Sequence, residues 1–270
     1  MDPFAAACRA VPGVPVPELA PAVATARPHG DAQWVPAGEL EHPAVLSSLL
    51  TAARGDAAAG NAVGAAVALA QGLTYTLAGP SLAGSAAAGL VLELDPAYTW
   101  LGFGARGFCE RLAVRPLTIV PAAGGFEDRL ARPVVAVLEP AFEQVHRLTR
   151  IGRRVLWAAV ADSVHQIMLG TVVARAGAWR GEQLRTALDD AWERAAAVVD
   201  ALAARAAAPL PRPRPFPVAD QTFAATWLVR GGCCFVYQEG GDYCVTCPII
   251  DDDVRRARLL RWLRGIAAPG

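Results

Sequence analysis

The spacing of apolar residues predicts a helical middle for this chain. In three successive segments the apolar positions recur every three or four residues, as they do in a helix that buries one face. We expect the first helix to carry Pro140 in its first turn and to end near Gly152. The second helix would follow it directly, with Val160 and Val164 on its apolar face, and the third would span about residues 181–207.

The first half of the chain has a mixed pattern. Residues 43–69 carry helical spacing, whereas residues 89–94 and 115–120 are short apolar runs bounded by glycine and proline, which is typical of strands. Residues 1–40 are rich in proline and alanine, which predicts an irregular arm. The expected fold class is α+β, with a helix-rich body and antiparallel strands.

The C-terminal part is predicted to form a separate small module. Prolines alternate with other residues at 209–217, which favours an extended connector. A strand-like run at 222–228 follows, and a final helix begins among Asp251–Asp253, with Arg255, Arg258 and Arg261 expected on its outer face. The predicted domains are an N-terminal arm (1–40), an α+β substrate-platform body (41–207), a proline-rich connector (208–219) and a C-terminal hairpin-plus-helix module (220–270).

Charge and composition narrow the classes of partner and location. The chain has 25 basic and 25 acidic residues, and because it contains no lysine, every basic residue is arginine. A net charge of zero provides no general attraction for phosphate backbones, so we expect no nucleic-acid partner. The acidic, proline-containing start does not resemble a secretory signal, and polar residues interrupt the alanine-rich stretch at 56–90. We therefore expect a cytoplasmic protein with no membrane span.

Four of the six cysteines lie within fifteen residues. These four are Cys233, Cys234, Cys244 and Cys247, whereas Cys8 and Cys109 stand alone. The nine-residue insert alternates apolar and polar residues around Gly240 and Gly241, which predicts a β-hairpin. The hairpin would place Cys234 opposite Cys247 and Tyr237 opposite Cys244. Gly231 and Gly232 would let the backbone bend and bring Cys233 towards the other thiols.

The spacing of the four cysteines favours an iron–sulfur cluster over zinc. Zinc sites usually use two separated Cys-x2–4-Cys turns, and the adjacent pair Cys233–Cys234 does not form one. A [2Fe–2S] cluster is larger and tolerates irregular spacing. A redox pair of Cys244 and Cys247 alone would leave the other two thiols unexplained. We therefore predict a [2Fe–2S] cluster, with structural zinc and plain thiols as the alternatives.

The cysteine segment resembles the C-terminal part of the ferric-siderophore reductases of the FhuF type. In that family a Cys-Cys pair, a ten-residue insert and Cys-x-x-Cys bind a [2Fe–2S] cluster, and the insert here is one residue shorter. The resemblance extends over about residues 225–262, and residues 153–161 are similar to a helix that precedes the cluster module. It implies one-electron reduction of siderophore-bound Fe(III), release of Fe(II), and a separate electron donor such as a ferredoxin or a flavoprotein reductase.

Five residues are candidates for contact with the siderophore or for tuning the cluster. Arg153, Arg154, Trp157 and Trp227 are candidates for the substrate surface, and Arg230, next to the cysteines, would raise the reduction potential. The alternatives are a solvated helix face for the arginines and a packed core for the tryptophans. At the level of function, the alternatives are a non-redox siderophore-binding protein with structural zinc and a general iron–sulfur electron carrier.

A glycine motif at residues 102–107 fits the dinucleotide-binding pattern Gly-x-Gly-x-x-Gly. That pattern needs a strand before it and a helix after it, whereas Pro116 and a strand-like run follow here. We expect no nicotinamide or flavin at this site.

Overall fold

The structure is a computed structural model that describes residues 22–25, 33–54, 62–176, 181–206, 208–220, 224–240 and 242–267. Cys8 and most of the predicted N-terminal arm lie outside these residues. Two segments of the arm that are described form strands, β1 (Ala22–Ala24) and β2 (Gln33–Pro36). The described part of the arm is thus tied into a sheet.

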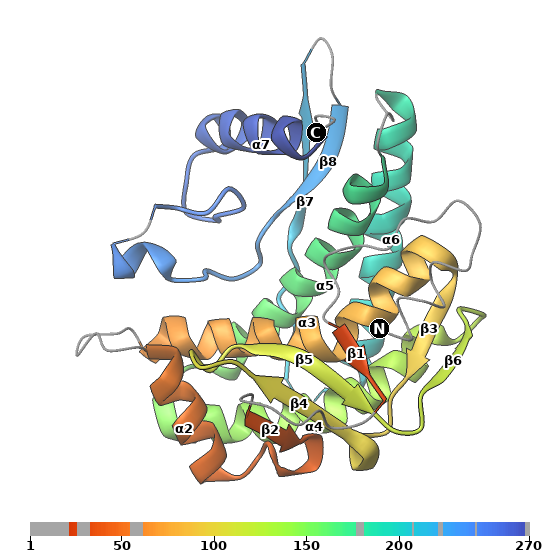
Figure 1. The fold of residues 1–270 in the computed structure, drawn as a ribbon. Helices are drawn as coiled ribbons and strands as arrows, with labels where there is room; N and C mark the ends of the chain where they lie inside the picture. Colours follow the sequence, from red (N-terminus) through yellow and green to blue (C-terminus); the bar gives the residue numbers. More distant parts are fainter. Residues whose placement is uncertain are drawn as a thin grey trace.

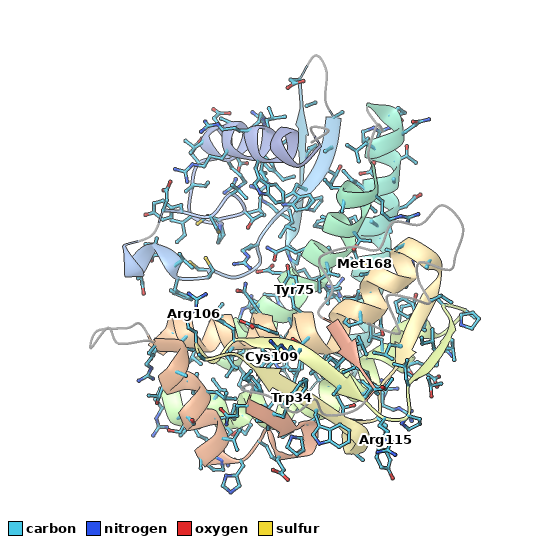
Figure 2. All side chains as sticks on the ribbon, in the orientation of Figure 1. Trp34, Tyr75, Arg106, Cys109, Arg115 and Met168 are labelled. Atoms are coloured by element: carbon cyan, nitrogen blue, oxygen red, sulfur yellow. The ribbon has the colours of Figure 1, made fainter. Side chains whose placement is uncertain are left out.

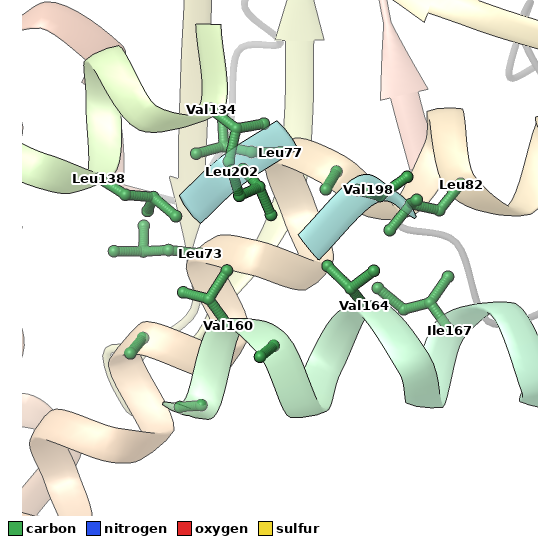
Figure 3. Packing of buried hydrophobic residues seen from close by; sticks show 14 of the residues in the cluster. Leu73, Leu77, Leu82, Val134, Leu138, Val160, Val164, Ile167, Val198 and Leu202 are labelled. Atoms are coloured by element: carbon green, nitrogen blue, oxygen red, sulfur yellow. The ribbon is translucent and has the colours of Figure 1, made fainter. Parts of the chain in front are cut away.

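Long helices build the body, as the apolar spacing predicted (Figure 1). They are α2 (Pro43–Arg54), α3 (Ala62–Ala88), α4 (Phe126–Thr149), α5 (Arg153–Ala176) and α6 (Glu182–Arg205). Helix α3 is apolar on all sides and packs against α5, α4 and α2, so it lies at the centre of the core. Figure 3 shows Leu73 and Leu77 of α3 meeting Leu138 of α4, Val160 of α5 and Leu202 of α6.

Helix α4 begins at Phe126, well before the predicted start at Pro140, and it contains both Pro133 and Pro140. The prediction of Pro140 in the first turn is therefore wrong. Each internal proline removes a backbone hydrogen bond, but Phe126, Leu130 and further apolar side chains on the same face are buried. Their burial offsets the cost of the prolines.

The strands form small sheets on the helices. One sheet has the order β1-β5-β4-β2, with β4 (Thr99–Phe103) and β5 (Cys109–Val114) antiparallel, β2 antiparallel to β4, and β1 parallel to β5. Strands β3 (Leu90–Glu93) and β6 (Thr118–Pro121) form an antiparallel pair. The α+β class is confirmed. In the first half of the chain, the two runs predicted as strands correspond to β3 and β6, whereas β4 and β5 were not predicted.

The glycine motif lies in the β4–β5 hairpin. No helix follows β4, so the structural context of a dinucleotide site is absent from this hairpin, as expected. Gly107 has a φ of 70°, and a Cβ atom there would lie 2.5 Å from the carbonyl oxygen of Leu49 in α2. The turn therefore needs glycine to pack against α2.

The C-terminal module consists of the antiparallel hairpin β7 (Arg214–Ala219) and β8 (Ala224–Val229), followed by α7 (Asp252–Ala267). This arrangement confirms a C-terminal hairpin plus helix, although the hairpin precedes the cysteines. Pro215 and Pro217 fit within β7 because, among the described strands, it pairs with β8 alone. Figure 1 shows the module above α3 and the four-stranded sheet below it.

The orientation predicted for the last helix is wrong at Arg255, whereas Arg261 is exposed as expected. Arg255 is 1% exposed and Leu259 is fully buried, whereas Val254 is 45% exposed. The buried face of the helix therefore differs from the predicted one. Arg255 lies on the buried face because its guanidinium group donates to backbone carbonyls beneath the helix.

Two helices are long and apolar enough to cross a membrane by length and composition, Ala62–Ala88 and Arg153–Arg175. The first of these helices lies in the alanine-rich stretch at 56–90, so the polar residues in that stretch do not prevent it from meeting this criterion. However, 67% and 83% of their most apolar windows are buried inside the protein. Core helices of soluble proteins meet the same criterion, so the two helices are weak evidence for a membrane span.

Candidate metal centre

The cysteines lie on a loop, which we call the cysteine loop and define as residues 230–247. Its base is closed by a hydrogen bond from the backbone N–H of Arg230 to the carbonyl of Thr246 (3.0 Å). The described residues of the loop contain no strand, so the predicted hairpin register is wrong. Instead, Phe235 (φ 61°) and Gly240 (φ 79°) flank the 3-10 turn Val236–Glu239. Two left-handed residues reverse the chain and prevent an extended strand.

The aromatic side chains of the insert pack on one another. The rings of Tyr237 and Tyr243 stack with centroids 5.1 Å apart. The predicted pairing of Tyr237 with Cys244 does not occur, because the 3-10 turn displaces Tyr237 from an extended register.

Two of the thiols form a close pair. The Sγ atoms of Cys234 and Cys244 are 3.8 Å apart. Two thiolate sulfurs bound at about 2.3 Å to one tetrahedral metal ion lie about 3.8 Å from each other. Cys247 follows through a turn in which its N–H donates to the carbonyl of Cys244 (3.0 Å). Cys233 accepts a hydrogen bond at Sγ from the N–H of Phe235 (3.3 Å).

The four cysteine side chains together are less tightly clustered than the Cys234–Cys244 pair. Among the described residues, no group of three or more His, Cys, Asp or Glu side chains meets the geometry of a metal-ion site. Cys234 and Cys247 are buried, and Cys233 and Cys244 are half-buried. The donors are thus four sulfur atoms on one loop near the surface, a set whose chemistry suits an iron–sulfur cluster.

Neighbouring groups shift the pKa values of the close pair, Cys234 and Cys244. The hydrogen bond between Cys244 and Cys234, together with the guanidinium group of Arg230, lowers the pKa of Cys234 to about 5. The same hydrogen bond and burial raise the pKa of Cys244. The lowered pKa of Cys234 favours its thiolate form, which is the form that binds metal. Cys109, which stands alone in the sequence, lies in β5 (Figure 2), and burial raises its pKa to about 12.

Asp162 of α5 supports the start of the cysteine loop. Its Oδ1 atom accepts a hydrogen bond from the N–H of Gly231 (2.7 Å), and its Oδ2 atom accepts one from Gly232 (3.3 Å). Arg230 is 9% exposed, and its Nε atom lies 3.8 Å from Asp162 Oδ2. Sequence reasoning missed Asp162, although a single acid within the apolar run Ala158–Val164 was a signal that it needs buried partners.

Gly231 and Gly232 allow the loop to approach the body closely. A Cβ atom on Gly231 would lie 2.8 Å from the carbonyl group of Arg212, and one on Gly232 would lie 2.7 Å from the Cβ of Ala158. Neither glycine has a left-handed φ. The glycine pair is required for packing against the connector and α5, in addition to any bend that brings in Cys233.

Helix α7 holds the other end of the loop. The buried Arg255 donates from Nε and Nη2 to the carbonyl of Cys247 (3.2 and 2.7 Å) and from Nη2 to that of Ile250 (2.6 Å). Arg258 donates from Nη1 to the carbonyl of Tyr243 (2.7 Å). The position of the Cys247 carbonyl therefore depends on the docking of α7.

The five candidate substrate and tuning residues do not form one surface. Trp157 and Trp227 are 1% and 3% exposed, in agreement with the packed-core alternative, so neither ring offers a broad substrate surface. Arg153 and Arg154 are exposed at the start of α5, and Arg153 forms an ion pair with Glu143. Of the five, Arg230 belongs to the cysteine loop itself, three residues before Cys233.

One comparison with known proteins identifies the cysteine loop. Residues 230–248 match the family model described as FhuF 2Fe-2S C-terminal domain. No curated protein matches the chain. The match spans all four clustered cysteines, confirms the resemblance found in the sequence, and supports a [2Fe–2S] cluster as the cofactor.

Proposed function

We propose that this protein, which carries a C-terminal domain of the FhuF 2Fe-2S type, is a cytoplasmic ferric-siderophore reductase. Its reaction would be the one-electron reduction of siderophore-bound Fe(III), with release of Fe(II) for iron assimilation. The observation that carries the proposal is the family match over the four cysteines. Siderophores bind Fe(III) through hard oxygen donors, and lowering the charge of the iron weakens that binding.

The residues of the cysteine loop fit this role. Cys233, Cys234, Cys244 and Cys247 would hold a [2Fe–2S] cluster, which supplies a site for one electron from a separate ferredoxin or flavoprotein reductase. Cys233 and Cys244 are half-buried, so the cluster site lies close to the protein surface. A ferric complex could therefore approach without a covalent bond to the protein.

Exposed apolar side chains border this site. Val236 is 48% exposed and Tyr243 is 38% exposed, and both belong to the cysteine loop. They provide contact area beside the thiols for a siderophore or a donor protein. Arg153 and Arg154 remain substrate candidates at a second place, where Arg153 and the edge of Trp157 help to line a pocket of about 320 Å³ between α4 and α5.

The first experiment tests the cofactor. The full chain is purified without oxygen, and its iron, acid-labile sulfide and zinc contents are measured together with its visible spectrum. We expect two iron and two sulfide per chain and a brown protein. Stoichiometric zinc in a colourless sample would contradict the redox function and support the non-redox siderophore-binding alternative.

The second experiment tests the substrate. Dithionite-reduced protein is freed of excess reductant and mixed with a ferric hydroxamate or a ferric catecholate siderophore, with an Fe(II) chelator present. We expect reoxidation of the protein to match the appearance of Fe(II). Reoxidation no faster than in buffer alone would support the general electron carrier instead. Arg153→Gln and Arg154→Gln, both on the exposed start of α5, should raise KM if these side chains contact the siderophore.

A further inference from the structure

Asp162 is the structural link between the body and the cysteine loop. It lies on α5 with 1% of its surface exposed, between the core residues Ala161 and Val164. Its two carboxylate oxygens accept the N–H groups of Gly231 and Gly232, the two residues before Cys233. A buried carboxylate with backbone N–H partners fixes the path of that backbone, because breaking either bond leaves a buried polar group unsatisfied.

Asp162 also faces a buried cation. The Nε atom of Arg230 lies 3.8 Å from Asp162 Oδ2, and this Nε atom has no hydrogen-bond partner among the described residues. With its amide oxygen turned towards the arginine, Gln71 of α3 accepts from Nη1 of Arg230 (3.1 Å). Two helices therefore hold the guanidinium group in place. Arg230 is also the first residue of the cysteine loop, three residues before Cys233, so its buried charge lies close to the thiols along the chain.

We propose that Asp162 is a positioning residue for the cluster site: it fixes the backbone before Cys233 and holds Arg230 beside the thiolates. This inference rests on the proposed [2Fe–2S] function. The Asp162–Arg230 pair then sets part of the electrostatic potential at the sulfur atoms. Charges in a partly buried site interact more strongly than charges in water, so each member of the pair changes the stability of an added electron.

The two members of the pair have opposite effects on the reduction potential. An added electron is disfavoured by the negative charge of Asp162 and favoured by the positive charge of Arg230. Asp162→Asn should therefore raise the midpoint potential, whereas Arg230→Gln should lower it. General loosening of the fold would not produce shifts of opposite sign.

The experiment compares the holoprotein with Asp162→Asn, Arg230→Gln and the control Ser163→Ala. Ser163 is the next residue on α5, is fully buried and has an Oγ atom without a partner among the described residues, so it matches Asp162 in place and burial. Midpoint potentials are measured by redox titration at pH 8, followed by EPR and visible absorption. Loss of the visible spectrum in the presence of an iron chelator is measured in parallel.

We expect a higher potential and several-fold faster cluster loss for Asp162→Asn, a lower potential for Arg230→Gln, and wild-type behaviour for Ser163→Ala. An unchanged potential in Asp162→Asn would overturn the inference. If Asp162→Asn does not fold, Arg230→Gln alone tests the inference. In that case a midpoint potential of Arg230→Gln equal to or above that of the wild type overturns the inference. A wild-type protein without iron and sulfide would instead overturn the proposed function itself.

Discussion

Substitution of Gly232 by alanine should push the cysteine loop away from α5. A Cβ atom at this position would lie 2.7 Å from the Cβ of Ala158, and the next nearest atoms, Ala158 Cα and Asp162 Oδ2, are 4.0 Å away. Carbon atoms pack at about 3.5–4.0 Å, so the loop or the helix must move by about 1 Å. The clash comes from one methyl group on a rigid helix.

The cost follows from two effects. Overpacking of this kind costs about 1–3 kcal/mol of unfolding free energy. The movement also lengthens the hydrogen bond from the N–H of Gly232 to Asp162, now 3.3 Å, and weakening it costs about a further 1 kcal/mol. We expect Gly232→Ala to destabilise the protein by about 2–4 kcal/mol in total.

Ala158→Gly should rescue this variant because it removes the opposing methyl group. On its own, Ala158→Gly costs about 1 kcal/mol through lower helix propensity. The double variant should then be more stable than the sum of the single effects predicts, by about 1–3 kcal/mol.

The assay is urea unfolding of the anaerobic holoprotein, together with its iron and sulfide content. Gly38→Ala is the matched control, because a Cβ atom there meets nothing within 4 Å and its φ is outside the left-handed region. If Gly232→Ala were as stable as this control, or if the double variant simply showed the sum of the two losses, the packing argument would be refuted.

Three further predictions concern buried groups. Burial lowers the pKa of His165 to about 4, below its unfolded value of about 6.5. The free energy of unfolding of the wild type relative to His165→Gln should therefore fall by about 2 kcal/mol from pH 7 to pH 5, which unfolding curves at each pH would show. Arg255→Met should cost about 2–4 kcal/mol in urea unfolding, because it leaves the Cys247 and Ile250 carbonyls without their partner, whereas the exposed Arg256→Met should cost less than about 0.5 kcal/mol. Cys247→Ser should lower the iron and sulfide content to well below half, and Cys109→Ser should leave it unchanged; equal contents in the two variants would contradict the assignment of ligands.

Helices with a continuous apolar stripe were predictable in this chain, and elements that depend on distant partners were not. The stripe of residues 181–207 predicted α6 closely, because burial of one face every 3.6 residues is a local pattern. Strands β4 and β5 were missed because their stability comes from pairing with other strands and from the packing of β5 against α3. The start of α4 was misplaced because local proline chemistry opposed a helix that tertiary burial stabilises.

The site shows the same division. A [2Fe–2S] cluster was predicted from the types and spacing of Cys233, Cys234, Cys244 and Cys247, because the sulfur donors that such a cluster needs can be recognised from residue type alone. The alternating pattern of the insert predicted a hairpin, but left-handed residues at Phe235 and Gly240 turn the chain into a 3-10 turn instead. The alternation of apolar and polar residues does not by itself reveal such a reversal of the chain.

The sequence by itself determined the four sulfur donors, the zero net charge, the helical middle and the α+β class. Only the tertiary structure placed Asp162 under the loop, buried Arg230 beside the thiols and moved Arg255 to the inner face of α7. The physical reason is that a charged side chain is buried only when groups from other elements complete its hydrogen bonds and balance its charge. Those groups lie far apart along the chain, and folding brings them together.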